Sequence, residues 1–172
     1  MWSTITEEAS AESSLWKQSL RPDGERELVA VFSPLAEERY GLGLETIYEG
    51  YLVHYGSPRL FAPPDDDTAL LLGDYLYAHG LKRIASAGDV AAVADLSELI
   101  SLCGQLRAED AEGDGPLWAA TAALLGTGAA LDGPRAALRL RGDPAALEAA
   151  ARAAAGDEPV ERALAAHALR LR

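Results

Sequence analysis

Apolar residues recur at intervals of three and four along most of this chain, which is the spacing that places side chains on one face of an α-helix. Residues 90–108 show the pattern most clearly, with apolar positions at Val93, Leu96, Ile100 and Cys103. Only Val29–Phe32 has the composition of a β-strand, and it is too short to outweigh its helical surroundings. The sequence therefore predicts an all-α fold, a helical bundle.

The predicted helices cover residues 5–20, 25–40, 44–55, 68–87, 90–108, 117–131, 144–155 and 159–171. We expect Thr6 and Asp67 to cap two of them, because a side-chain oxygen there can accept from a free backbone N–H. Pro34 should kink or restart the second helix. Glycines at 41 and 43 should end it, and Asp132–Pro134 should end the helix over 117–131.

The chain has 172 residues, of which 49% are apolar, enough for one compact domain with a substantial core. The last helices are rich in alanine, which favours helix but buries little surface. We expect them to need a packing surface from this domain or another chain. Cys103 is the only cysteine, which excludes an internal disulfide, and its apolar position predicts burial.

The net charge of −12 argues against binding to nucleic acid or anionic lipid, which both require clustered Lys and Arg. Residues 1–112 hold 20 acidic and 8 basic residues, whereas residues 113–172 hold 7 of each. The excess forms either a solvated surface or a face for a basic protein partner. The longest uncharged apolar run, residues 117–131, is shorter than the roughly 20 residues that span a membrane. We expect a cytoplasmic protein without stable membrane insertion.

One stretch carries a recognisable order of motifs. Gly56-Ser57-Pro58 is followed by Gly73-Asp74-Tyr75-Leu76, then by Gly88-Asp89 and Gly104-Gln105. This order resembles the middle of trans-polyprenyl diphosphate synthases, in which a Gly-Arg-Pro loop leads to a helix with Gly-Asp-Tyr-Leu. The resemblance implies a shortened isoprenoid synthase fold, with residues 1–23 as an N-terminal helix and turn, 24–133 as a prenyl-synthase-like core, and 134–172 as Ala-rich C-terminal helices.

That family's chemistry implies magnesium ions held by two aspartate-rich motifs. The alignment places Glu45 and Glu49 at the first motif, and they are the candidate metal ligands. Alternatively, the two glutamates form a solvated stripe. The second motif and the diphosphate-binding Lys and Arg have no counterpart, and such groups usually supply most of the catalytic stabilisation. We expect no catalytic residues and no cofactor, with Mg²⁺ only if the Glu45–Glu49 site is functional.

Other polar residues favour structural roles. Asp65–Asp67 follow two prolines and precede a helix, which is typical of a cap rather than a metal cluster. Asp74 is expected to make a buried hydrogen bond. His54, His79 and His167 lack ligand spacing, and none is placed as a general base.

The resemblance and the missing motifs together imply a non-catalytic subunit that associates with, and regulates, a catalytic prenyl diphosphate synthase. Self-association is an alternative form of partnership. A different class of function is a helical scaffold that keeps only the fold and binds an unrelated protein. A third is an isoprenoid-binding protein with an apolar tunnel between its helices.

Overall fold

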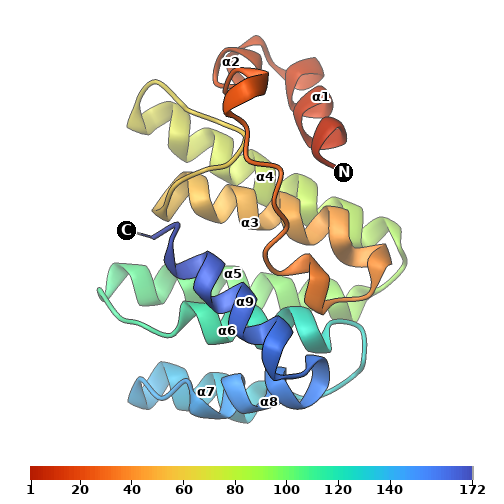
Figure 1. The fold of residues 1–172 in the computed structure, drawn as a ribbon, viewed down its shortest axis with the longest axis vertical. Coiled ribbons are helices and arrows are strands. Elements are labelled where there is room, and N and C mark those ends of the chain that lie inside the picture. The colour runs from red at the N-terminus through yellow and green to blue at the C-terminus, as the bar shows by residue number, and fades with distance from the viewer. Residues whose placement is uncertain (172) are drawn as a thin grey trace.

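The computed structural model describes residues 1–171. In that part of the chain the regular elements are helices and none is a strand, so the predicted all-α class is confirmed (Figure 1). The α-helices are α1 (Trp2–Glu12), α2 (Ser14–Gln18), α3 (Gly41–Tyr55), α4 (Asp66–Ser86), α5 (Val90–Ala108), α6 (Asp114–Leu124), α7 (Asp132–Arg141), α8 (Ala145–Ala155) and α9 (Asp157–Ala168). Three 3₁₀ turns, η1 (Asp23–Glu25), η2 (Ser33–Leu35) and η3 (Glu38–Tyr40), lie between α2 and α3. No helix of the described residues has the length and apolarity that crossing a membrane requires.

The helices pack in tiers around α3 (Figure 1). α1 and α2 lie above the α3–α4 pair, α5 and α6 lie below it, and α7 and α8 form the far end. α9 crosses α6 and brings the C-terminal end of the chain back beside α3. Nearly all of α3 is buried, since it packs on other helices and loops along most of its length. Side chains on α3 therefore reach two separate apolar clusters, one under α1 and α2 and a larger one among α5, α6, α8 and α9.

Glycines let α3 and α4 approach backbone to backbone. A Cβ atom on Gly80 would lie 2.3 Å from Ile47 Cγ1 and 2.9 Å from the carbonyl oxygen of Gly43. A Cβ atom on Gly50 would lie 2.9 Å from the carbonyl oxygen of Gly73. Real side chains do not reach such distances, so these positions accept only glycine without a shift of the helices. The glycines thus set the α3–α4 separation and the place of every side chain on α3.

Several predicted helices are confirmed within a few residues. Those over 44–55, 68–87, 90–108, 144–155 and 159–171 correspond to α3, α4, α5, α8 and α9. α3 begins at Gly41, three residues before the predicted start, so the glycines at 41 and 43 belong to this helix instead of ending an earlier one. Cys103 is fully buried, as predicted.

The N-terminal predictions are partly wrong. The helix over residues 5–20 is interrupted at Ser13, whose backbone is extended and whose side chain accepts from the N–H of Leu15. Thr6 is not a cap, because its hydroxyl donates to carbonyl oxygens inside α1. No α-helix forms over residues 25–40, which hold only the short 3₁₀ turns η2 and η3 after the end of η1. The rest of this segment is irregular. Buried side chains of α3 and of the loop after it bind backbone N–H and carbonyl groups that an α-helix would pair internally.

Two further boundaries differ from the prediction. Asp65, not Asp67, caps α4 by accepting from the N–H of Thr68 at 2.7 Å. α6 ends at Leu124 instead of 131, because the chain turns through Gly126 and Gly128 with φ values of 76° and 75°. Asp132–Pro134 start α7 and do not end a helix, in keeping with the preference of proline for the first helical turn.

Candidate functional site

The two candidate metal ligands, Glu45 and Glu49, lie one turn apart on α3 and enclose Arg59 from the following loop. Arg59 Nη1 lies 2.5 Å from Glu45 Oε2, and Arg59 Nε lies 2.9 Å from Glu49 Oε2. None of the three side chains has exposed surface. We call these residues the Glu–Arg–Glu cluster. Their burial contradicts the alternative prediction of a solvated stripe.

Backbone groups use the remaining oxygen atoms of the cluster. Glu45 Oε1 accepts from the N–H groups of Val31 and Ser33 at 3.1 and 3.0 Å. Glu49 Oε1 accepts from the N–H of Leu60 at 2.7 Å. Each carboxylate oxygen therefore has a partner. The cluster fixes two irregular segments, residues 29–33 and 59–60, against α3.

Each nitrogen of the Arg59 guanidinium likewise donates a hydrogen bond, and two aromatic rings lie beside the group. Its Nη1 and Nη2 also donate to the carbonyl oxygens of Val29 and Glu45. The guanidinium lies 4.9 Å from the ring of Trp2 and 5.0 Å from that of Tyr48, where ring faces attract a cation. Burial alone would lower the pKa of Arg59, but the adjacent carboxylates Glu45 and Glu49 outweigh it and raise that pKa.

The cluster bears directly on the predicted metal site. A divalent ion at Glu45 and Glu49 would need their oxygen atoms as ligands, and the guanidinium and backbone N–H groups already occupy them. A cation of that kind would have to displace Arg59. In the described part of the chain, no group of three or more His, Cys, Asp or Glu side chains is arranged to hold a metal ion.

A second buried cluster surrounds Asp114 at the start of α6. Asp114 Oδ2 accepts from the hydroxyl of Tyr51 and from Arg107 Nη2, and His167 Nε2 lies 3.2 Å from it. His167 Nδ1 lies 2.9 Å from the hydroxyl of Tyr48, which is the ring that packs on Arg59. We call this set the Asp114 cluster. It joins α3, α5, α6 and α9 through polar contacts in the larger apolar core.

The Asp114 cluster favours a fixed charge over proton transfer. Burial alone would raise the pKa of Asp114, but hydrogen bonds from His167 and Tyr51 and the charge of Arg107 hold it well below its usual range. Burial raises the pKa of both Tyr48 and Tyr51 far above the ordinary tyrosine value. A carboxylate of low pKa is a weak base, and a tyrosine of high pKa is a poor nucleophile. The cluster is suited to holding α9 against α3.

A hollow of about 480 Å³ reaches the Asp114 cluster from the surface, between α5, α6 and α9. Its charged lining consists of Arg107, Asp110, Glu112, Asp114 and His167. The only lining groups that are buried, Asp114 and His167, already bond to each other. Among the described residues, the lining of the hollow thus contains no unpartnered buried polar group that would select a ligand.

The remaining predicted residues lie apart from both clusters. The side chain of Asp74 is 66% exposed and lies 3.3 Å from His54 Nε2, so the predicted buried hydrogen bond is wrong. Burial lowers the pKa of His54, partly offset by the charge of Asp74. His79 lies on α4 beside Tyr75 and near Glu8 of α1. The three histidines therefore form no common site.

Sequence reasoning missed Arg59, Asp114 and the role of His167. Arg59 directly follows Gly56-Ser57-Pro58 and directly precedes the apolar pair Leu60–Phe61. This position next to apolar residues was the available signal that Arg59 is buried. Asp114 is preceded by Gly113, whose φ of 115° starts α6 abruptly. No signal in the sequence links His167 to Asp114 across 53 residues. In comparisons of the chain with protein-family models, curated proteins and solved structures, none matches.

Proposed function

We propose that this chain is a non-catalytic, polyprenyl-synthase-like helical subunit that associates with a catalytic prenyl diphosphate synthase and regulates it. The Glu–Arg–Glu cluster is the observation that carries the proposal. In prenyl synthases the acidic pair would bind magnesium, and here an arginine supplies the positive charge from within the chain. Arg59 gives the carboxylates a counter-charge but cannot bridge them to a diphosphate.

The resemblance in sequence motifs supports the same proposal. Its specific part, residues 56–105, covers the loop that carries Arg59 together with α4 and α5. The Gly-Asp-Tyr-Leu run at 73–76 lies on α4, where Gly73 faces α3 at close range. Glycine at this position has a packing role, so the motif can persist in a chain that has lost the catalytic groups.

Exposed apolar side chains on α4 support association with another protein. Leu70 and Leu71 are each 55% exposed, although they lie on the helix that packs most extensively on α3. Two adjacent exposed leucines on a regular helix cost solubility unless a partner covers them. We place the contact with the synthase on this exposed side of α4.

Co-purification tests the proposed association. The tagged chain is mixed with the catalytic prenyl diphosphate synthase of the same cell, and the complex is isolated by size exclusion. We expect a stable complex with the wild-type chain and at least a tenfold loss of affinity for the double substitution Leu70→Asp and Leu71→Asp, since a charge in a buried contact is strongly unfavourable. Arg141→Ala, at the exposed end of α7 and away from α4, serves as the control. A failure of the wild-type chain to bind the synthase would refute the proposal.

A further inference from the structure

Residues 26–31 form an extended segment that lies on the surface and crosses in front of α4 and α3 (Figure 1). Leu28 and Val29 in its centre are 54% and 55% exposed. The segment has no strand partner in the described chain, but one of its two backbone edges is held from below. The groups that hold it belong to the Glu–Arg–Glu cluster and the loop that carries Arg59.

Three hydrogen bonds define this inner edge. The N–H of Glu27 donates to the carbonyl oxygen of Arg59 at 3.2 Å, and the carbonyl oxygen of Val29 accepts from Arg59 Nη1 at 2.8 Å. The N–H of Val31 donates to Glu45 Oε1 at 3.1 Å. The odd-numbered residues thus turn their backbone polar groups toward the buried cluster. Arg59 and Glu45 provide the hydrogen-bond partners that a neighbouring strand would provide along this edge.

The opposite edge is open. Along an extended chain the N–H and C=O groups of successive residues point to alternate sides, so those of Leu28 and Ala30 face away from the cluster. Within residues 1–171, the backbone of neither residue takes part in a hydrogen bond. The segment therefore resembles the edge of a sheet, with the backbone groups of Leu28 and Ala30 as its free outer edge. Such an edge is a template for pairing with another extended chain.

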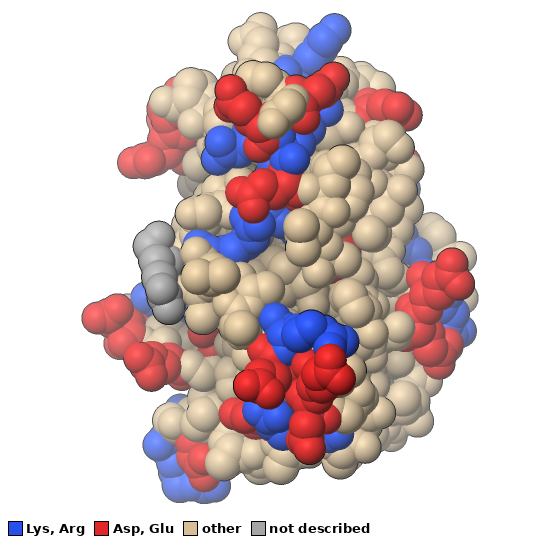
Figure 2. Space-filling view, in the orientation of Figure 1, with Lys and Arg blue, Asp and Glu red and all other residues tan. Residues whose placement is uncertain are grey.

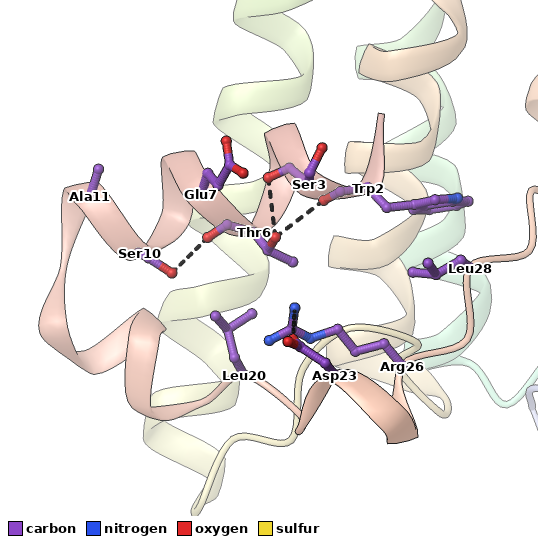
Figure 3. A pocket seen from close by; sticks show the side chains of 10 residues that line it. All are labelled: Trp2, Ser3, Thr6, Glu7, Ser10, Ala11, Leu20, Asp23, Arg26 and Leu28. Atoms are coloured by element: carbon purple, nitrogen blue, oxygen red, sulfur yellow. Dashed lines mark hydrogen bonds and ion pairs between the residues drawn. The ribbon is translucent and has the colours of Figure 1, made fainter.

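The side chains of the segment confirm the alternation. Arg26 and Leu28 line a hollow of about 670 Å³ below α1, together with Trp2 and Leu20 (Figure 3). Glu27, Val29 and Val31 line a second hollow of about 460 Å³ beside α9. One hollow thus lies on each side of the segment. A strand added to the outer edge would direct its alternate side chains over these two hollows.

We propose that the outer edge of residues 28–30 binds an extended peptide segment of another protein by adding it as a β-strand. The net charge of −12 favours a partner segment that carries basic residues. The space-filling view shows acidic and basic side chains in the upper and central part of this face, with a wider uncharged area beside them (Figure 2). A second copy of this chain would bring together two molecules of net charge −12, which opposes close approach. The proposal holds whether or not the partner is a prenyl synthase.

The probe for this test is a blocked synthetic peptide, Lys-Val-Thr-Val-Thr-Val-Lys. Binding to the ¹⁵N-labelled full chain is followed by amide shifts and hydrogen exchange. We expect exchange at Leu28 and Ala30 to slow by at least about tenfold at saturation, whereas Glu27 and Val31 change little because their N–H groups are already bonded. Absence of binding, or protection elsewhere only, would overturn the proposal.

Backbone recognition is separated from side-chain contact by N-methylated peptides. One peptide carries N-methyl groups on its valines and another on its threonines, so each blocks one edge of the added strand. We expect one of the two to bind and the other to fail, and a peptide methylated on both edges to fail. Equal binding by all three would show that the backbone is not recognised and would refute strand addition.

Substitutions in the chain provide the reciprocal control. Ala30→Pro removes an outward N–H and should weaken peptide binding by at least about tenfold, whereas Val29→Pro removes an inward one and should leave binding within about twofold. Equal effects would contradict the assignment of edges. If Ala30→Pro prevents folding, the methylated peptides on the wild-type chain still decide the matter. A sedimenting dimer that Ala30→Pro abolishes would identify a second copy as the occupant and overturn the proposed partner.

Discussion

Arg59 Nη1 lies 2.5 Å from Glu45 Oε2, and neither side chain has exposed surface. This contact joins the loop after α3 to the helix itself, and Glu49 completes it from the next turn. The pair explains why the irregular residues 26–33 have a fixed course, since the same two side chains bind their backbone. It also explains how two buried carboxylates lie side by side on one helix.

Arg59→Met should destabilise the fold by about 3–5 kcal/mol at neutral pH, because it leaves two buried carboxylates without a counter-charge. Adding Glu45→Gln and Glu49→Gln to this substitution should recover part of the loss, since each glutamine removes a charge but keeps an oxygen for the backbone N–H groups. Chemical denaturation measures the free energy of unfolding of both variants. A triple variant that is less stable than Arg59→Met would contradict the charge-based explanation.

Asp114→Asn should lower the free energy of unfolding by about 3 kcal/mol at pH 7, because it removes the buried negative charge that pairs with Arg107, although one acceptor oxygen remains. The depressed pKa of Asp114 sets the pH dependence. Its stabilisation is complete above the unfolded-state pKa of about 4 and is lost as the pH falls toward the lower folded-state value. The difference between wild type and variant should therefore shrink below about pH 4.

Denaturant titrations across this pH range provide the check. Asp110→Asn, an exposed residue of the same hollow, is the matched control and should leave stability nearly unchanged. A wild-type-to-Asp114→Asn difference that stays constant below pH 4 would argue against an ionised Asp114.

Gly80→Ala should destabilise the fold by about 1–3 kcal/mol, because the added Cβ atom overlaps Ile47 and the backbone of α3. Gly104→Ala is the matched comparison, since it also lies inside a helix but its nearest neighbour, the hydroxyl of Tyr55, would be 3.7 Å from the new atom. We expect Gly104→Ala to raise stability by about 0.5–1 kcal/mol through helix propensity. Thermal melts of both variants test the close α3–α4 contact, and equal effects would exclude it.

Asp65→Ala should cost about 1 kcal/mol of stability through loss of the cap on α4. Asp67→Ala removes an acidic side chain from the first turn but no hydrogen bond to the backbone, and we expect a smaller loss. Urea denaturation compares the two. A larger loss of stability for Asp67→Ala than for Asp65→Ala would show that Asp67 is the cap, as the sequence predicted.

The long helices could be predicted from sequence because their periodicity directly reflects which face is buried. α5 has the predicted bounds, Val90–Ala108. Residues 25–40 could not be predicted in the same way. Their conformation depends on Glu45 and Arg59, which bind the backbone of this segment from a distance in sequence, and local propensity carries no information about those contacts.

The candidate site shows the same division. Helical spacing placed Glu45 and Glu49 on one face of α3, and the structure confirms that they lie one turn apart. What sequence could not supply was the third member, because Arg59 enters from a proline-containing loop without periodicity. Asp114 and His167 are similarly brought together only by the crossing of α9 over α6. Contacts between distant elements decide the chemistry of both clusters.

The most direct test of the proposed function is a measurement of prenyl transfer, with products separated by chain length. The chain alone, supplied with Mg²⁺, an allylic diphosphate and isopentenyl diphosphate, should give no product above a protein-free control. The catalytic synthase of the same cell should change its rate or its product length when the chain is added, and the Leu70→Asp, Leu71→Asp variant should not cause this change. Mg²⁺-dependent product formation by the chain alone, or a synthase indifferent to its presence, would contradict the account.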